Sequence, residues 1–245
     1  MHYHELLTVL GNAVGDIFLS TYNHVICCLS VMLFIAAAVS YQSILLYTGD
    51  GNQTYPIEAI NNYLDWVNVM NYDYHGSWEC CNTGEHTALY DPTSNLNTNY
   101  GISNWLKAGL RQKKCALGLA YYGKTWTLVS LKNTSVGAPT SKAGDYLLYR
   151  DIVTFNKEAP KSTVLLDKAT VSMISFKSNL TWVGYDNPTT IARKVNYAKR
   201  RGLLGYFAWA LHHDDDKHSL AKAGECLPIH NYTTYFVKGV SGNEI

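Results

Sequence analysis

The sequence predicts an α/β fold built on a parallel sheet or barrel, and three observations support this. Two short, continuously apolar runs, Cys115–Tyr122 and Leu203–Leu211, are typical of strands buried on both faces of a parallel sheet. Segments with helical periodicity alternate with these runs along the chain. Between Lys124 and Tyr185 short β-like runs replace this alternation, which indicates an inserted α+β lobe of the kind that loops of α/β barrels carry.

Regular alternation begins at Tyr55. Pro56 opens a short helix, and a strand is expected at 65–72, where apolar and polar residues alternate. A polar loop then runs from Gly76 to about Tyr100. The next helix has apolar residues at helical spacing, namely Ile102, Trp105, Leu106 and Leu110.

The inserted lobe and the helix after it follow from the same signals. The lobe is expected to contain one helix near Tyr149–Lys157 and β-like runs at Val164–Leu166, Val171–Phe176 and Thr181–Gly184. Asn187-Pro188 is expected to cap the following helix, which Gly202 ends. The residues expected to face inward are Ile191, Val195 and Ala198, and those expected to face solvent are Arg193, Lys194, Lys199 and Arg200.

Residues 1–48 fit the pattern least well. The apolar run Val25–Val39 is shorter than the ~20 residues that a membrane helix needs. No basic residue precedes it, so it lacks the n-region of a signal peptide. A buried strand or helix is the main interpretation, and an internal signal-anchor is the alternative. Membrane association is expected only in the second case.

Composition and charge exclude some classes of function. The formal net charge is +1, which argues against a nucleic-acid-binding surface. The six cysteines show no C-x-x-C spacing, so no zinc site is expected. The run His212-His213-Asp214-Asp215-Asp216 contains metal-ligating residue types, but consecutive residues in one loop cannot all converge on an ion. It is interpreted as a solvated loop, and neither a metal nor a cofactor is expected.

Four N-x-S/T sequons indicate a secretory route and an extracellular location. They are the sequons of Asn52, Asn133, Asn179 and Asn231, each a candidate glycosylation site.

The candidate site lies in the stretch LDWVNVMNYDYHGSW, from Leu64 to Trp78. An aspartate, Asp73, follows its apolar strand in a cluster of polar and aromatic side chains. A carboxylate at the end of such a strand must be paired, hydrogen-bonded or functional. Two interpretations remain open: Asp73 caps a neighbouring loop, or it belongs to a binding or catalytic site.

Several stretches, in the same order along the chain, resemble plant class V chitinases of glycoside hydrolase family 18 and the related chitinase-like ectodomains of plant receptor kinases. They are YPIEAINNYLDWVNVMNYDYHGSW, TGEHTALYDPTSN, YGISNWLKAGL, LGLAYYGKTWTL, WVGYDNP and GLLGYFAWAL, and they lie within Leu33–Ala223. That family forms a (β/α)₈ TIM barrel with an α+β insertion after the seventh strand. On this resemblance, strands five to eight correspond to Leu33–Val39, Val67–Asp73, Ala116–Tyr121 and Leu204–Trp209.

The resemblance therefore implies an incomplete barrel, truncated at its N-terminal side. Residues 1–32 match nothing in the family, 33–225 form the partial barrel with the insertion at 124–185, and 226–245 are a tail. A half-barrel would expose two sheet edges. Three outcomes are open: residues 1–48 cover an edge, two chains associate through their edges, or the sequence is a truncated gene product that folds poorly.

The resemblance also assigns roles to individual residues. Met70, Tyr72 and Asp73 match the M-x-Y-D motif, in which the Tyr hydrogen-bonds the N-acetyl group of the sugar at the scission point and the Asp supports that site. Trp209 matches the tryptophan beneath this sugar, although a core aromatic is the alternative interpretation. Further wall residues of the same cleft would be Tyr122, Trp126 and Trp78.

Family 18 enzymes carry their catalytic Asp and Glu in a D-x-x-D-x-D-x-E signature, and these 245 residues do not contain it. Loss of a positioned general acid costs about 10²–10⁴-fold in rate. The chain is thus expected to bind chitin or chitooligosaccharides without hydrolysing them. Two alternatives are an active chitinase represented by a truncated chain, and a structural or storage protein with no ligand.

Overall fold

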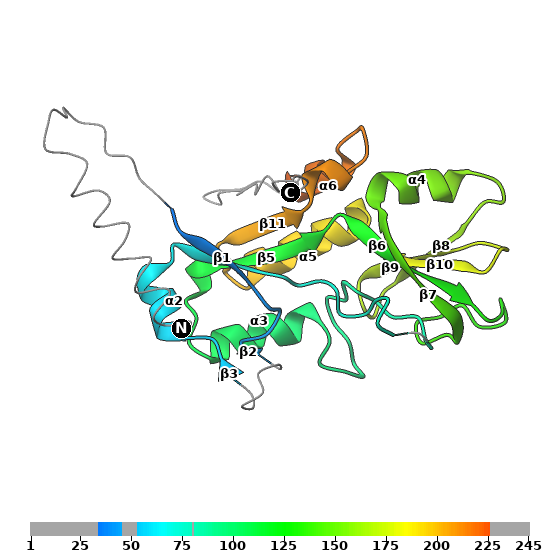
Figure 1. The fold of residues 1–245 in the computed structure, drawn as a ribbon. Coiled ribbons are helices and arrows are strands. Elements are labelled where there is room, and N and C mark those ends of the chain that lie inside the picture. The colour runs from blue at the N-terminus through cyan, green and yellow to red at the C-terminus, as the bar shows by residue number, and fades with distance from the viewer. Residues whose placement is uncertain (1–33, 46–52, 80, 226–245) are drawn as a thin grey trace, which may run out of the picture.

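The computed structural model describes residues 34–45, 53–79 and 81–225. Its first sheet has four parallel strands in the order β1 (Ala36–Val39), β4 (Trp66–Val69), β5 (Cys115–Ala120) and β11 (Gly205–Trp209) (Figure 1). In the register, Val69 pairs with Leu117 and Ala120 pairs with Trp209. Because the strands are parallel, the segments that follow β4, β5 and β11 all leave from one edge of this sheet.

Helices and the parallel sheet share one apolar core. The helices are α2 (Ile57–Tyr63), α3 (Thr98–Lys107), α5 (Pro188–Arg200) and α6 (Ser219–Glu225). Alternate strand residues such as Val67, Leu117 and Tyr206 pack in this core with Ile102 and Ile191 from the helices. All of these side chains are nearly or fully buried, and burial of one such apolar side chain stabilises the fold by about 1.5–3 kcal/mol.

A second, antiparallel sheet lies beyond the carboxyl end of β5 (Figure 1). Its order is β7 (Thr140–Leu148), β6 (Tyr122–Leu128), β10 (Thr181–Tyr185), β9 (Ser172–Phe176) and β8 (Thr163–Asp167), with α4 (Tyr149–Lys157) after β7. This sheet has its own core, which contains Trp126, Leu128, Ala138, Ile174 and Trp182. The strands expected near 164–166, 171–176 and 181–184, and the helix expected at 149–157, are thus present.

Helix boundaries follow the capping signals of the sequence. The side chain of Asn187 accepts a hydrogen bond from the Thr190 N–H, and Pro188 occupies the first turn of α5. Asn97 caps α3 in the same way through the Tyr100 N–H. The remaining elements are short: β2 (Ile44–Leu45), β3 (Gln53–Thr54), η1 (Gln112–Lys114) and η2 (Leu211–His213).

The strand expected at 65–72 is shorter than predicted, since β4 covers only Trp66–Val69. Past its end, the Asn71 N–H bonds back to the Val69 carbonyl at 2.9 Å, which turns the chain out of the sheet. Residues Met70–Asp73 therefore lie beyond the strand, at the carboxyl edge of the sheet.

Only part of the N-terminal apolar run is described. Ala36–Val39 forms β1, whereas Val25–Leu33 lies outside the described residues. Within the strand Val39 is buried but Ala36 and Ala38 are exposed, so the expectation of a buried element holds only at its end. Among residues 34–45, 53–79 and 81–225, no helix combines the length and apolarity that crossing a membrane requires.

Two of the four sequons can be located. Asn133 and Asn179 are exposed in turns of the second sheet, and each side chain accepts hydrogen bonds from residues two positions later in its turn. Asn52 and Asn231 lie outside the described residues. Glycosylation at these asparagines stays a prediction.

Lys194 was expected at the surface of α5, and this expectation is wrong. Its side chain is buried, and its ammonium donates to both carboxylate oxygens of Asp186 at 2.7 and 2.5 Å and to the Thr87 carbonyl. Lys194 lies three residues after Ile191 and so faces the core with it. The ion pair joins α5, the end of β10 and the loop before α3.

Lys194→Met is expected to destabilise the protein by about 3–5 kcal/mol, because the substitution leaves Asp186 buried without a countercharge. The measurement is urea unfolding followed by circular dichroism. Arg193→Met is the matched control, since Arg193 is the exposed neighbour on the same helix, and it is expected to change stability by less than about 0.5 kcal/mol. Equal effects of the two substitutions would contradict a structural role for the Lys194–Asp186 pair.

Candidate functional site

Tyr72 and Asp73 lie at the carboxyl edge of the parallel sheet because the chain turns out of β4. Asp73 has a φ of 60°, a left-handed conformation that aspartate tolerates better than most residues. The neighbouring strand makes room for this turn with a glycine. A Cβ on Gly118 would lie 2.5 Å from the Val69 carbonyl oxygen and 3.0 Å from the Tyr72 ring.

Three side chains converge on one oxygen of Asp73. The Tyr122 hydroxyl donates to Oδ1 at 2.8 Å, the Lys124 ammonium lies 3.2 Å from it, and His86 Nδ1 lies 3.7 Å from it. Among the described residues no such contact reaches Oδ2, and 42% of the Asp73 side chain is exposed. The second oxygen is therefore available to a ligand.

The electrostatics keep Asp73 ionised. Burial alone would raise its pKa, but the contact with His86, the hydrogen bond from Tyr122 and the charge of Lys124 outweigh burial and lower the pKa to about 2. In turn, burial and the Asp73 charge raise the pKa of the Tyr122 phenol, so the phenol keeps its proton and acts as the donor. Asp73 is thus a fixed anion at neutral pH.

Aromatic side chains surround this carboxylate. The Tyr72 ring makes edge contacts with Tyr122 at 6.2 Å and Phe207 at 6.4 Å between centroids. Phe207 and Trp209 stand two residues apart on β11 and so on one face of the sheet. Phe207 is buried, whereas Trp209, at the carboxyl end of the strand, is 47% exposed and offers its indole to solvent.

Trp78 and Lys124 extend this surface. Trp78 is 59% exposed, and the Lys124 ammonium lies 5.6 Å from its ring centroid and 5.5 Å from that of Tyr122. Lys124 thus connects Trp78 with Asp73. On the other side of Tyr122, the rings of Tyr146 and His213 lie at 6.1 and 6.0 Å.

Trp126, predicted as a wall residue of the cleft, does not lie on its surface. The side chain is 1% exposed and packs edge-on against Trp182 in the core of the second sheet, so this expectation is wrong. Trp126 follows Tyr122 and Lys124 on the same face of β6, but the strand has by then carried it into the second core. Its indole N–H donates to the Glu79 carbonyl at 3.3 Å and so holds the loop after Trp78.

Met70 is partly buried, and its N–H bonds to the Val39 carbonyl at 3.0 Å. Met70 thus connects the end of β4 to the end of β1 through its backbone.

The sequence analysis did not identify two residues of the site, His86 and Lys124. Lys124 could have been found, since it stands two positions after Tyr122 in a strand and so shares its face. No local pattern marks His86, which reaches Asp73 from a loop.

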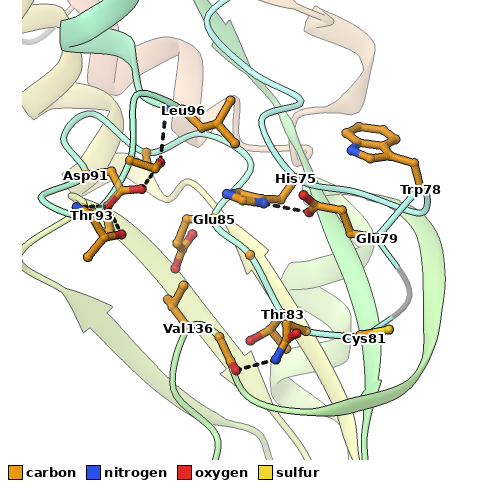
Figure 2. A pocket seen from close by; sticks show the side chains of 16 residues that line it. His75, Trp78, Glu79, Cys81, Thr83, Glu85, Asp91, Thr93, Leu96 and Val136 are labelled. Atoms are coloured by element: carbon orange, nitrogen blue, oxygen red, sulfur yellow. Dashed lines mark hydrogen bonds and ion pairs between the residues drawn. The ribbon is translucent and has the colours of Figure 1, made fainter.

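A cavity of about 600 Å³ borders the exposed Trp78 (Figure 2). It lies between the loop in which His75 Nδ1 is hydrogen-bonded to Glu79 at 2.7 Å and the turn at Val136 and Gly137. The acidic residues among those that line it are Glu79, Glu85 and Asp91, and none of the lining residues is a Lys or an Arg.

Glu85 lies in the middle of these lining side chains and is only 2% exposed (Figure 2). Burial, followed by the charge of Asp167, raises the pKa of its carboxyl well above the ordinary value, and the Lys194 charge opposes this only in part. The Glu85 carboxyl is therefore protonated at a pH where exposed glutamates are ionised.

The run at 212–216 is more ordered than a solvated loop. Asp214 is buried, and its carboxylate accepts hydrogen bonds from the Asp215, Leu220 and Ala221 N–H groups, so it caps α6. His213 is also buried. Within the described part of the chain, no three His, Cys, Asp or Glu side chains are grouped as a metal site requires.

Comparison with known proteins gives a consistent result. The family model of Glycosyl hydrolases family 18 matches residues 18–214, so the match begins within residues 1–32, for which no resemblance was expected. The chain is 41% identical over 189 residues to the class V chitinase CHIT5a of Medicago truncatula, covering 75% of this chain and 48% of that protein. The chain therefore spans about half the length of these curated relatives.

Solved structures show the same likeness. A mutant GH18 chitinase of Cycas revoluta in complex with (GlcNAc)4 superimposes with a TM-score of 0.80 and 33% identity, covering 91% of this chain and 62% of that one. The chitinase-like agglutinin RobpsCRA of Robinia pseudoacacia superimposes with a TM-score of 0.74 and 32% identity, covering 91% and 61%.

Tyr122→Phe is expected to raise the pKa of Asp73 by about one pH unit, because it removes a hydrogen bond to a charged group. The measurement is an NMR titration of the Asp73 carboxyl carbon. Tyr146→Phe is the control, since this exposed tyrosine contributes only ring contacts to Tyr122 and His213. An unchanged Asp73 titration in Tyr122→Phe would refute the hydrogen-bonding role of Tyr122.

Glu85→Gln is expected to stabilise the protein at pH 8 and to have little effect at pH 4. An unfolded glutamate ionises near pH ~4.3, whereas folded Glu85 keeps its proton to higher pH. Above that pH the folded state binds more protons than the unfolded state, so stability falls as the pH rises. Gln is neutral throughout and lacks this loss.

Thermal unfolding at several pH values measures the effect of Glu85→Gln. Glu58→Gln, at an exposed position of α2, is the control, and its stability relative to wild type is expected to stay nearly constant with pH. Parallel pH profiles for wild type and Glu85→Gln would show that Glu85 ionises normally.

Proposed function

The chain belongs to glycosyl hydrolase family 18, and from that premise we propose that it binds chitooligosaccharides across Asp73, Tyr72 and Trp209. The convergence of Tyr122, Lys124 and His86 on one oxygen of Asp73 carries the proposal, because it fixes the carboxylate and leaves Oδ2 for a sugar. A fixed anion at the rim of an aromatic surface suits a ligand with hydroxyl and amide donors.

The aromatic residues would supply the apolar half of recognition. The C–H face of a pyranose needs a large flat partner, and the exposed indole of Trp209 provides one. Tyr72 would hydrogen-bond the N-acetyl group of the sugar above Trp209. Trp78 would contact a further sugar beyond Lys124. The complex of the Cycas revoluta chitinase with (GlcNAc)4 supports this class of ligand.

We further propose that this chain does not hydrolyse its ligand, because its 245 residues contain no D-x-x-D-x-D-x-E signature. Without an Asp to orient the acetamide and a Glu to protonate the leaving oxygen, the sugar would be held but not cleaved. The chitinase-like agglutinin from Robinia pseudoacacia makes a binding role on this fold credible. The alternatives are an active chitinase represented by part of its chain, and a structural or storage protein.

The finer architecture is also a proposal. We assign β1, β4, β5 and β11 to strands five to eight of an incomplete barrel, with an insertion lobe at 124–185. In the described residues β1 pairs only with β4, and β11 only with β5, so both edges could take part in self-association.

We also propose that the protein is secreted as a glycoprotein, and the exposed sequons at Asn133 and Asn179 support this.

Isothermal titration with chitohexaose tests the function, and Trp209→Ala is expected to weaken binding at least about tenfold, equivalent to about 1.4 kcal/mol. Tyr63→Ala is the control, since Tyr63 is an exposed aromatic on α2, and it is expected to bind as wild type does. Absence of heat with correctly folded wild-type protein would favour the structural or storage alternative.

The same protein is then incubated with chitotetraose, and no product above that of Tyr72→Phe is expected. Turnover above this control would overturn the proposed loss of hydrolysis but leave the binding proposal intact.

A further inference from the structure

The buried imidazole of His86, beside the candidate site, faces more hydrogen-bond acceptors than its neutral form can satisfy. The side chain is fully buried, and each ring nitrogen faces an acceptor. Nε2 lies 3.1 Å from the Tyr122 carbonyl oxygen, and Nδ1 lies 3.7 Å from Asp73 Oδ1. The imidazole also packs against the Tyr122 ring, with the two ring planes tilted by 34° and their centroids 5.0 Å apart, so it cannot turn away from either acceptor without losing this contact.

A neutral imidazole carries one N–H and therefore satisfies only one of these two acceptors. The Tyr122 carbonyl is at hydrogen-bond distance and Asp73 is not, so the N–H belongs on Nε2. Nδ1 then presents a lone pair towards a carboxylate and has no hydrogen-bond partner. A second proton, on Nδ1, would convert this unfavourable contact into a charge-assisted hydrogen bond.

The surroundings oppose that second proton in the free protein. Burial lowers the pKa of His86, and although contact with Asp73 and the charge of Asp186 raise it, the Lys124 charge acts with burial. The charged or titratable groups that act on the ring are thus Asp73 after β4, Tyr122 and Lys124 on β6, and Asp186 after β10. The ring is neutral at pH 7.

A bound ligand would change the protonation equilibrium of His86 by changing the hydration of Asp73. The Asp73 side chain is 42% exposed, so water now weakens its attraction for a charged His86. A sugar lying over Asp73 would displace this water and strengthen the attraction. An ammonium group has no site for a further proton, which leaves the buried imidazole as the group that can take one up.

On the premise of the proposed function, we propose that His86 is a proton-linked positioning residue for Asp73. When an oligosaccharide covers Asp73, a proton from the solvent binds His86 Nδ1, which then donates to Asp73 Oδ1. The Nε2–H bond to the Tyr122 carbonyl is kept. The carboxylate is thereby held more firmly, with Oδ2 directed to the sugar. Affinity for a neutral oligosaccharide therefore rises as the pH falls.

Calorimetric titration of chitohexaose in two buffers of different ionisation enthalpy tests this inference, because the difference in heat gives the number of protons taken up. Wild type is expected to take up as much as ~1 proton per oligosaccharide between pH 5 and 7, equivalent to at most a tenfold change in affinity per pH unit. His86→Gln, which carries no titratable group, is expected to take up none and to bind with a flat pH profile.

His218→Asn is the control, since His218 is exposed and asparagine tolerates its left-handed backbone conformation. This control is expected to retain proton uptake. Equal uptake by wild type and His86→Gln, or no uptake by wild type, would overturn the inference. A purely structural role of His86 would weaken binding without changing proton uptake.

A measurement without ligand separates this inference from the proposed function. Nitrogen-15 NMR of the wild-type protein, with His86 assigned by its absence in His86→Gln, is expected to show the Nε2–H tautomer at pH 7. If chitohexaose does not bind, the proposed function fails, and this spectrum still decides the geometry of His86. The Nδ1–H tautomer at pH 7 would contradict it.

Discussion

The carboxylate of Asp73 is the point on which the arrangement of the site depends. One of its oxygens receives the Tyr122 hydroxyl and the Lys124 ammonium and faces His86, and these residues come from β6 and from the loop before α3. The anion therefore connects three separate segments: the end of β4, the loop before α3, and β6. Removing its charge would abolish the ion pair that, among the described residues, holds the Lys124 ammonium beside Trp78.

The parallel sheet and the second sheet meet at this carboxylate. β6 starts at Tyr122, only two residues after the last residue of β5, so Tyr122 and Lys124 belong to the second sheet while Asp73 belongs to the first. A buried ion pair between Lys194 and Asp186 and the protonated Glu85 lie between the same two parts of the fold. Polar groups thus connect the two apolar cores. Each of them has to be placed precisely, because a buried polar group without a partner is costly.

The sequence predicted the helices and strands better than it predicted the surroundings of individual side chains. The β5 and β11 strands and the α4 and α5 helices follow from periodicity and capping, since both are local signals. The buried ammonium of Lys194 donates to the Thr87 carbonyl, 107 residues away in the sequence, as well as to Asp186. His86 lies against the Tyr122 carbonyl, 36 residues away. Contacts between such distant residues leave no local pattern in the sequence. The position of Trp126 was predicted wrongly for another reason. The alternation of side chains along a strand shows which residues share a face of the sheet, but it does not show whether that face lines a cleft or packs in a core.

The indole N–H signals of the protein's six tryptophans provide the most direct test of the sugar surface. On titration with chitotetraose, the signals of Trp209 and Trp78 are expected to shift in NMR spectra, because both side chains are exposed and belong to the proposed sugar surface. Those of the buried Trp105, Trp126 and Trp182 are expected to stay in place. If Trp209 did not shift while the protein bound the oligosaccharide, the sugar would lie elsewhere and the account would be wrong.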